Sequence, residues 1–552
     1  MNRKAKLIST LILGGGVVCL VLILPIVAHY HAKGHLATFK AQLRKQGERL
    51  RISELKSALS ADDLNGADAL MTTANRLRPS SPSSNTPPLM RRTSAGRALV
   101  AWKQENLSNG EVSNVWASLS RSLADTWEPL QEIAELLEGN SLGFNLSYEQ
   151  GFSLMLPQLT RLKGAAQWLS AVAILELHEG RTSNAWQTIG ALTALVERNK
   201  NESLMICELV RIAIASIAVA TTWEALQANG WRDQELKELQ GAWASVDFLS
   251  QTEAALAMER AMGEKTFEAG RGSYAMISAG FSGASAASSL AELKQLGQDV
   301  IDNPKEGLRN MARRYPGYWH WKWWQSYDDE LANAEIIQAS LEAVRAAKKE
   351  RFFWPALQEL EKSAVRVRKA HPRAGQWLGY SWADDGMITR FFARVLRIEI
   401  ERSLLVMAIA LKRYELKHGV WPAQLSGLAP DFAEALLRDP VDGKPLRYRR
   451  QADGTFLLYS VGEDGQDNGG DATPAVSASR HWTRARDAAW PQPAAEAEAK
   501  LEVEKLAAEW RKAAEQAART TSNLTSVELE FRKRYGLELP ASSQPNTSTN
   551  AP

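Results

Sequence analysis

The sequence has few of the residues that most often carry covalent or metal chemistry. Its 552 residues include 2 cysteines and 8 histidines. Cys19 lies in the first apolar run and Cys207 in a segment with helical spacing, so the chain cannot build a disulfide framework or a cysteine-based metal site. We interpret Cys207 as a small buried hydrophobic residue.

The short sequence motifs of common hydrolases are also missing. The sequence contains no Gly-x-Ser-x-Gly nucleophile elbow. The stretch "LHEG" at residues 177–180 is not followed by the second histidine that a His-Glu-x-x-His zinc site requires. We therefore predict that the protein is not an enzyme.

The sequence also has no large excess of positive or negative charge. The 66 Lys and Arg residues nearly balance the 63 Asp and Glu residues, and the formal net charge is +3. Such a balance does not produce the basic field that draws proteins to nucleic acids. We expect no nucleic-acid partner.

One apolar run is long enough to cross a bilayer. Residues 7–27 read "LISTLILGGGVVCLVLILPIV" and contain no charge; as a helix they extend roughly 31 Å, against a hydrocarbon core of about 30 Å. The basic tip "MNRKAK" favours a cytoplasmic N-terminus. A cleaved signal peptide is the open alternative to an uncleaved anchor. Both alternatives place the bulk of the chain outside the cytoplasm, so we expect a single-pass protein of a bacterial inner membrane.

The rest of the chain has mainly helical periodicity. The predicted fold is mainly α, with an N-terminal transmembrane helix, a large all-helical ectodomain, a small C-terminal α+β module and a disordered tail. The apolar stretch at 212–223 is too short for a second span, and we predict a core helix there. The predicted boundaries are a basic tip at 1–6, the anchor at 7–27, a stalk helix at 28–78, a linker at 79–94, the helical ectodomain at 95–390, the module at 391–471, an irregular segment at 472–493, charged helices at 494–536 and the tail at 537–552.

Tryptophan is the one residue type in clear excess, with 19 in the chain. The densest cluster, "RRYPGYWHWKWW" at 313–324, contains Trp319, Trp321, Trp323 and Trp324. Three interpretations stay open for it. The tryptophans fill gaps between helices, which we favour, or they form a membrane-interface belt, or they form a platform that stacks on glycan rings.

The C-terminal third has the clearest local pattern. An amphipathic helix is indicated over about 396–414, and Gly419 and Pro422 end it. Alternating apolar residues at 446–448 and 456–461, separated by a turn at Asp453-Gly454, predict a β-hairpin. The apolar stripe of the helix consists of Leu396, Ile400, Leu404, Met407, Leu411 and Tyr414.

This region resembles the C-terminal part of the major type II secretion pseudopilins. The similarity covers about 396–471 and rests on "ALKRYELKHGVWPAQLSGLAP", "RDPVDGKPLRYR" and "LLYSVGEDGQDNGGD". The resemblance implies that the last, acidic and glycine-rich loop binds calcium. Calcium prefers six to eight oxygen ligands, and the candidate ligands are Asp464, Asp467, Asn468 and Asp471.

A solvated acidic turn is the alternative to calcium in this loop. We interpret Asp439 and Asp442 as turn caps, because Asp-Pro and Asp-Gly are turn signals. The family also has a late Asp after its loop, for which Asp487 is only a distant counterpart.

The chain also departs from a pseudopilin. It has no prepilin peptidase site at its N-terminus, and some 370 residues separate residues 7–27 from the module. The whole layout resembles membrane-anchored proteins of planctomycete and verrucomicrobial bacteria. We expect a non-enzymatic envelope protein that presents the module for protein contacts; an accessory of a type II secretion or type IV pilus-like machine, or an envelope glycan-binding protein, are the alternatives.

Overall fold

The structure is a computed structural model. It describes residues 26–77, 87–105, 107, 115–124, 126–139, 142–273, 298, 303, 305, 317–375, 385–475, 481–512 and 515–516. The predicted anchor up to residue 25 and the predicted tail at 537–552 lie outside the described residues.

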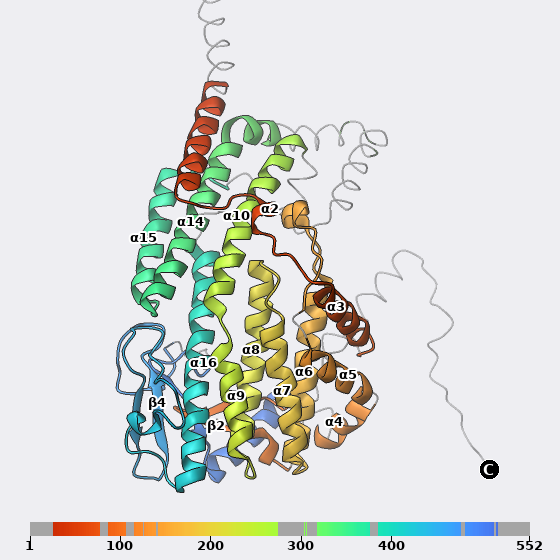
Figure 1. Cartoon of the computed structure of the whole chain (residues 1–552), viewed down its shortest axis with the longest axis vertical. Coiled ribbons are helices and arrows are strands. Elements are labelled where there is room, and N and C mark those ends of the chain that lie inside the picture. The colour runs from red at the N-terminus through yellow and green to blue at the C-terminus, as the bar shows by residue number, and fades with distance from the viewer. Residues whose placement is uncertain are drawn as a thin grey trace, which may run out of the picture.

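The described chain is mainly helical, as predicted, and two small sheets flank the helices (Figure 1). Helices also cover residues 26–45 and 496–512. The labelled helices are α2 (Ile52–Leu55), α3 (Ala61–Ala74), α4 (Val115–Ala124), α5 (Trp127–Glu138), α6 (Pro157–His178), α7 (Thr182–Arg198), α8 (Met205–Leu226), α9 (Asp233–Ser245), α10 (Phe248–Gly272), α14 (Ser326–Glu350), α15 (Trp354–Ala370) and α16 (Asp385–His418).

Helix α8 lies in the middle of the helical body. Among the described helices it is the one long and apolar enough to cross a membrane, yet most of it is buried against α6, α7, α10 and α16. Burying an apolar helix on all sides removes its surface from water without a bilayer. The prediction of a core helix at 212–223 is confirmed.

The predicted stalk at 28–78 is wrong as a single helix. The first helix ends at residue 45 and the chain turns at Gly47, whose φ is +86°, a backbone conformation that glycine adopts readily. The chain then forms α2 and α3, and Leu36, Leu43 and Leu50 are buried. These leucines fold the segment back onto the helical body, so little of it extends as a free stalk.

The predicted linker at 79–94 ends in a strand. Strands β1 (Arg91–Ser94) and β2 (Arg97–Leu99) form an antiparallel pair, and β2 pairs in parallel with β6 (Gln492–Pro493). Glu224 of α8 holds this sheet to the body, because its carboxylate accepts the backbone N–H groups of Met90 and Ala101, both at 2.9 Å. The predicted irregular segment at 472–493 therefore contains a strand that pairs with residues almost 400 positions earlier.

The predicted C-terminal hairpin is present. Strands β3 (Arg447–Arg450) and β4 (Phe456–Ser460) pair antiparallel with Arg450 opposite Phe456, and β5 (Ala488–Ala489) adds to β4. Side chains of β4 alternate between two clusters, with Phe456 and Leu458 in the main core and Leu457 and Tyr459 in a small outer cluster. The alternation of apolar residues thus correctly predicted the hairpin of this small antiparallel sheet.

The module is not a separate domain, however. Helix α16 contacts α8 and α9 as well as β4, and a single core cluster extends from Leu70 to Trp490. The predicted boundary at 390/391 falls inside α16, which begins at Asp385. This helix packs on the helical body as well as on the hairpin, so it does not separate two domains. The helix and hairpin of the predicted module are one side of the helical body.

The described part of the predicted charged helices packs on the first sheet. Ala499 and Leu506 lie against Leu99, and Arg91 forms ion pairs with Glu502 at 2.5 Å and Glu509 at 3.0 Å. The segment is a component of the fold of this chain.

Candidate functional site

The acidic loop after β4 is a series of tight turns. Asp464, Asp467 and Asp471 each accept the backbone N–H two residues ahead, at 2.9, 3.0 and 3.0 Å. The side-chain amide of Asn468 donates to the carbonyl of Gln466 at 3.1 Å. These are the short-range bonds that Asp and Asn form in turns.

Asp487 holds the loop from the inside. Its side chain is buried, and one carboxylate oxygen, Oδ2, accepts the N–H groups of Asn468, Gly470 and Asp471 at 3.0, 2.7 and 3.1 Å. Burial raises the pKa of Asp487, and these three hydrogen bonds oppose that rise. In the fold, the distant Asp487 is brought directly against the loop.

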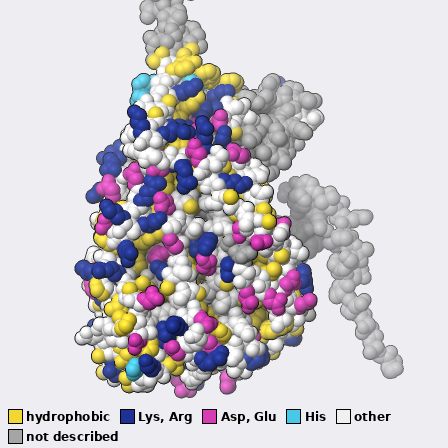
Figure 2. Space-filling model, viewed as in Figure 1, with side chains coloured by type: hydrophobic (Ala, Val, Ile, Leu, Met, Phe, Trp, Pro, Cys, Tyr) yellow, Lys and Arg dark blue, Asp and Glu magenta, His cyan; other side chains and the backbone are white. Residues whose placement is uncertain are grey.

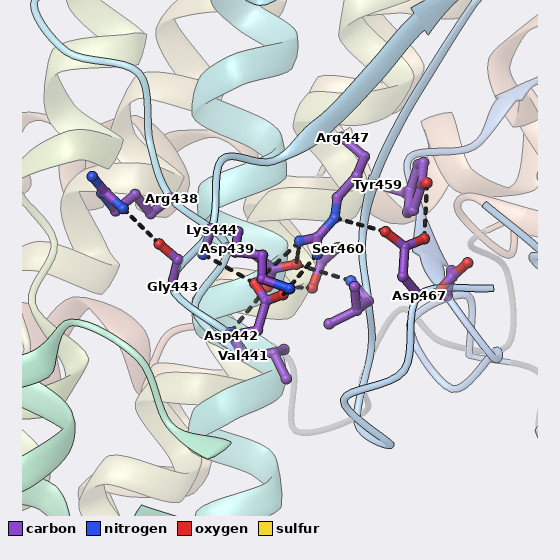
Figure 3. A network of polar contacts seen from close by, with 12 residues as sticks. Arg438, Asp439, Val441, Asp442, Gly443, Lys444, Arg447, Tyr459, Ser460 and Asp467 are labelled. Atoms are coloured by element: carbon purple, nitrogen blue, oxygen red, sulfur yellow. Dashed lines mark hydrogen bonds and ion pairs between the residues drawn. The ribbon is translucent and has the colours of Figure 1, made fainter. Parts of the chain in front are cut away.

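Arg447 links the loop to the turn before the hairpin (Figure 3). Its guanidinium is bidentate on Asp442, with Nη1 at 3.1 Å and Nη2 at 2.7 Å from the carboxylate oxygens. Nη1 also donates to Asp439 at 2.8 Å, and Nε donates to Asp467 at 3.1 Å. One cation therefore bridges three carboxylates from two separate loops.

Asp439 is the most deeply buried acid of this network, with 0 % of its surface exposed. Its oxygens also accept the hydroxyl of Ser460 at 2.7 Å and the N–H groups of Val441 and Val461, both at 2.9 Å. Burial raises the pKa of Asp439, while these bonds lower it. Asp439 does cap a turn, as predicted, and it also joins that turn to the end of β4.

In the described arrangement, acids of the loop are already engaged by donors of the chain itself. The oxygens of Asp467 and Asp471 face N–H donors, Arg447 or Arg486. Across the described residues, no group of three or more His, Cys, Asp or Glu side chains is placed to hold a metal ion. Of the four candidate ligands Arg447 contacts Asp467, and calcium binding by the loop stays a prediction.

Sequence reasoning missed Arg447 and the role of Asp487. The signal for Arg447 was the "RYRR" of β3, because alternation places Arg447 and Arg449 on one face of the strand. No local signal marks Asp487. Its role depends on β5 pairing with β4.

The tryptophan cluster forms a second candidate site. Trp321 is 0 % exposed, and its indole N–H donates to Asp329 at 2.8 Å. Trp319, Trp323 and Trp324 are exposed by 49 %, 38 % and 40 %. Trp321 is therefore a core residue and cannot be part of the predicted glycan-stacking platform. The other three tryptophans of that platform lie on the surface.

One of these tryptophans, Trp323, lies beside the helix over 26–45. The ring of His29 is 4.8 Å from that of Trp323 and 4.9 Å from that of Tyr327, between centroids. Ile26, Val27 and Tyr30 are exposed on the same helix. Figure 2 shows hydrophobic side chains gathered at this end of the molecule, with lysine and arginine side chains next to them.

Basic side chains lie over the aromatic rings of this end. The ammonium of Lys322 is 5.2 Å from the ring centroid of Trp319, and that of Lys33 is 6.0 Å from Tyr327. The combination of indole rings with lysines is typical of proteins that contact the interfacial layer of a bilayer.

Comparisons of the chain with protein-family models, with curated proteins and with solved structures give no match.

Proposed function

We propose that the protein is a non-enzymatic, membrane-anchored envelope protein. Residues 7–27 would cross the membrane, the exposed tryptophans would rest on its outer surface, and the helical body would hold the pseudopilin-like region away from it for contacts with another envelope protein. The observation that carries the proposal is the exposure of Trp319, Trp323 and Trp324, with Trp323 against His29 near the start of the helix over 26–45.

The positions of the first helix and of β4 support this orientation relative to the membrane. The helix over 26–45 lies at one end and β4 with its loops lies at the other (Figure 1). A protein that is held to a bilayer by one end presents the other end to partners in the envelope. The aromatic end lies next to the residues that follow the apolar run at 7–27.

A firm connection between the first helix and the body also supports the proposal. Lys40 forms an ion pair with the buried Glu330 at 2.6 Å. Glu48 pairs with Arg260 at 3.0 Å and with Arg345. An anchor attached in this way fixes the orientation of the body relative to the membrane, which a flexible linker does not.

The far end has the properties of a pre-organised contact surface. Arg447 and Asp487 fix the loops around β3 and β4 before any partner arrives. Leu416 and Val420, at the end of α16, are exposed, and the neighbouring Trp421 contacts the hairpin turn at Gly454. A rigid loop surface with a few exposed apolar residues loses little entropy on binding.

Quenching of tryptophan fluorescence by brominated lipids tests the membrane contact. The full chain is reconstituted into liposomes with and without brominated acyl chains. Residues 1–27 contain no tryptophan, so the signal comes from the remainder of the chain. We expect bromine to quench the wild type and to quench a triple Trp319→Phe, Trp323→Phe, Trp324→Phe variant much less.

Trp421→Phe is the matched control, because Trp421 lies past the end of α16 and donates its indole N–H to the carbonyl of Gly454. The control should be quenched like the wild type. Equal quenching of all three proteins would contradict the proposal.

A further inference from the structure

A cavity of about 610 Å³ lies between the first sheet, α8, α16 and the C-terminal helix. This volume suits a small ligand. Much of its wall is apolar, including Met90, Ile217, Ala220 and Trp482. Neither of the two sites described above uses the polar residues of this cavity.

Glu401 of α16 is the buried acid of this cavity. Its residue surface is 1 % exposed. The hydroxyl of Ser216 donates to Oε2 at 3.2 Å, and His481 approaches Oε1 to 3.5 Å. Oε1 has no hydrogen-bond donor among the described residues.

A second polar atom on the wall is in the same state. The hydroxyl of Thr93 is buried and also lacks a hydrogen-bond partner among the described residues. Buried polar atoms are nearly always satisfied, and each exception calls for a physical explanation. Both oxygens are therefore able to accept hydrogen bonds from a molecule bound in the cavity.

The acid at Glu401 favours a cationic donor there. Burial raises the pKa of Glu401 to about 7, and Ser216 and Arg397 oppose that rise. Burial, together with Arg397 and Arg484, lowers the pKa of His481 to about 4, so this histidine is neutral at pH 7 and does not neutralise the acid. Arg91 and Lys505 on the wall are paired with Glu502, at 2.5 and 3.6 Å. Arg92 also lines the cavity, and burial lowers the pKa of its guanidinium.

We propose that this cavity binds a small amphipathic amine. The ammonium group would form an ion pair with Glu401 and donate to Thr93, and the apolar part would lie against Ile217 and Trp482. An ammonium group has three donors, which matches the oxygens of Glu401, Thr93 and Ser216. This inference does not rest on the membrane proposal and extends the function to ligand binding.

Calorimetric titration of the full chain in detergent with n-hexylamine tests the proposal. We expect saturable binding that is at least tenfold weaker in Glu401→Gln, which keeps the shape of the side chain but cannot become an anion. At pH 6, binding to the wild type should release a proton from Glu401, seen as heat that depends on the ionisation enthalpy of the buffer. That proton release should disappear in Glu401→Gln.

Two controls make the result specific. Glu498 lies on the helix over 496–512, which also carries the cavity residues Glu502 and Lys505, but Glu498 itself does not line the cavity. The Glu498→Gln variant should bind hexylamine like the wild type. Ala220→Leu fills the cavity from the α8 side and should weaken binding even if Glu401→Gln does not fold. No binding of hexylamine, equal binding of hexanoate or 1-hexanol, or unchanged binding by both cavity variants would overturn the proposal.

Discussion

At the scale of single residues, the described chain places ionised groups inside the fold and pairs them there. Arg447, Asp439 and Asp442 form the clearest case, because a 15 % exposed guanidinium lies against a carboxylate with no exposure. Burial alone disfavours both charges. Their attraction and the further hydrogen bonds to Asp439 offset that cost, so removing one partner is more damaging than replacing both.

Substituting Arg447 tests this pairing. We expect Arg447→Met to lower the free energy of unfolding by about 3 kcal/mol, because it leaves Asp439 buried without its cation. Arg447→Lys should recover only part of the loss, since an ammonium cannot bridge Asp442 in the bidentate manner. Chemical denaturation measures both values. Arg450→Met, at the exposed end of the same strand, is the control, and a similar loss in all three variants would contradict the role of Arg447.

His371 should make stability depend on pH. Burial disfavours its charged form, but Asp328 and Glu335 raise its pKa to about 9; the ring nitrogens lie 2.6 and 3.2 Å from these carboxylates. A raised histidine pKa gives stability that is fully present below about pH 6.5 and is lost as the pH rises through about 9. The loss should be on the order of 3 kcal/mol.

Denaturation of wild type and His371→Gln between pH 6 and 10 isolates this effect from the buried carboxyl groups that titrate in the same range. The difference in unfolding free energy between the two proteins should shrink as the pH rises. A difference that stays constant with pH would show that His371 is not charged in the fold.

At the scale of elements, the loops and the first helix are held by long-range contacts of a few side chains. The acidic loop depends on Asp487, which lies beside β5, and the helix over 26–45 depends on Lys40 and Glu48. Local sequence determines the backbone conformation of each segment, and these long-range contacts determine its position in the fold.

Calcium binding by the acidic loop, which the pseudopilin resemblance implies, can be tested on the full chain. Equilibrium dialysis should detect a saturable calcium site with a dissociation constant on the order of 10⁻⁴ M, which Asp464→Ala should abolish. The ion would compete with the N–H groups and arginines that Asp467 and Asp471 already engage. The absence of a saturable site would contradict the calcium loop and leave a solvated acidic turn.

Glu48→Gln should loosen the first helix without unfolding the body. Glu48 is almost fully buried between Arg260 and Arg345. We expect amide hydrogen exchange over 26–45 to accelerate on the order of tenfold, with exchange in β3 and β4 unchanged. Glu268→Gln breaks an exposed pair with Lys265 and should change little, since surface pairs contribute little. Equal effects of the two variants would show that Glu48 does not fix the helix.

The parts of the fold that sequence could predict are those set by local periodicity. The stripe of α16 and the alternation of β4 were readable because each repeats within a few residues. The turn at Gly47 was missed because charges at helical spacing continue past it. The pairing of β2 with β6, and the contact of Asp487 with the loop, join residues that only the fold brings together.

At the scale of the whole molecule, the two ends of the described chain differ in their surface residues. One end has exposed tryptophans and lysines beside the first helix, and β4, whose flanking loops are held by Arg447 and Asp487, lies away from that end (Figure 1). The body between them shares one core, so the two ends should keep a fixed relation.

The distance of each end from a bilayer tests this arrangement most directly. The full chain, with Cys19→Ser and Cys207→Ala, takes a donor dye at His320→Cys beside the tryptophans or at Asp464→Cys in the acidic loop; both positions are exposed. The protein is reconstituted into liposomes that contain an acceptor lipid. We predict efficient energy transfer from position 320 and weak transfer from position 464, whereas equal transfer, or stronger transfer from 464, would contradict the account.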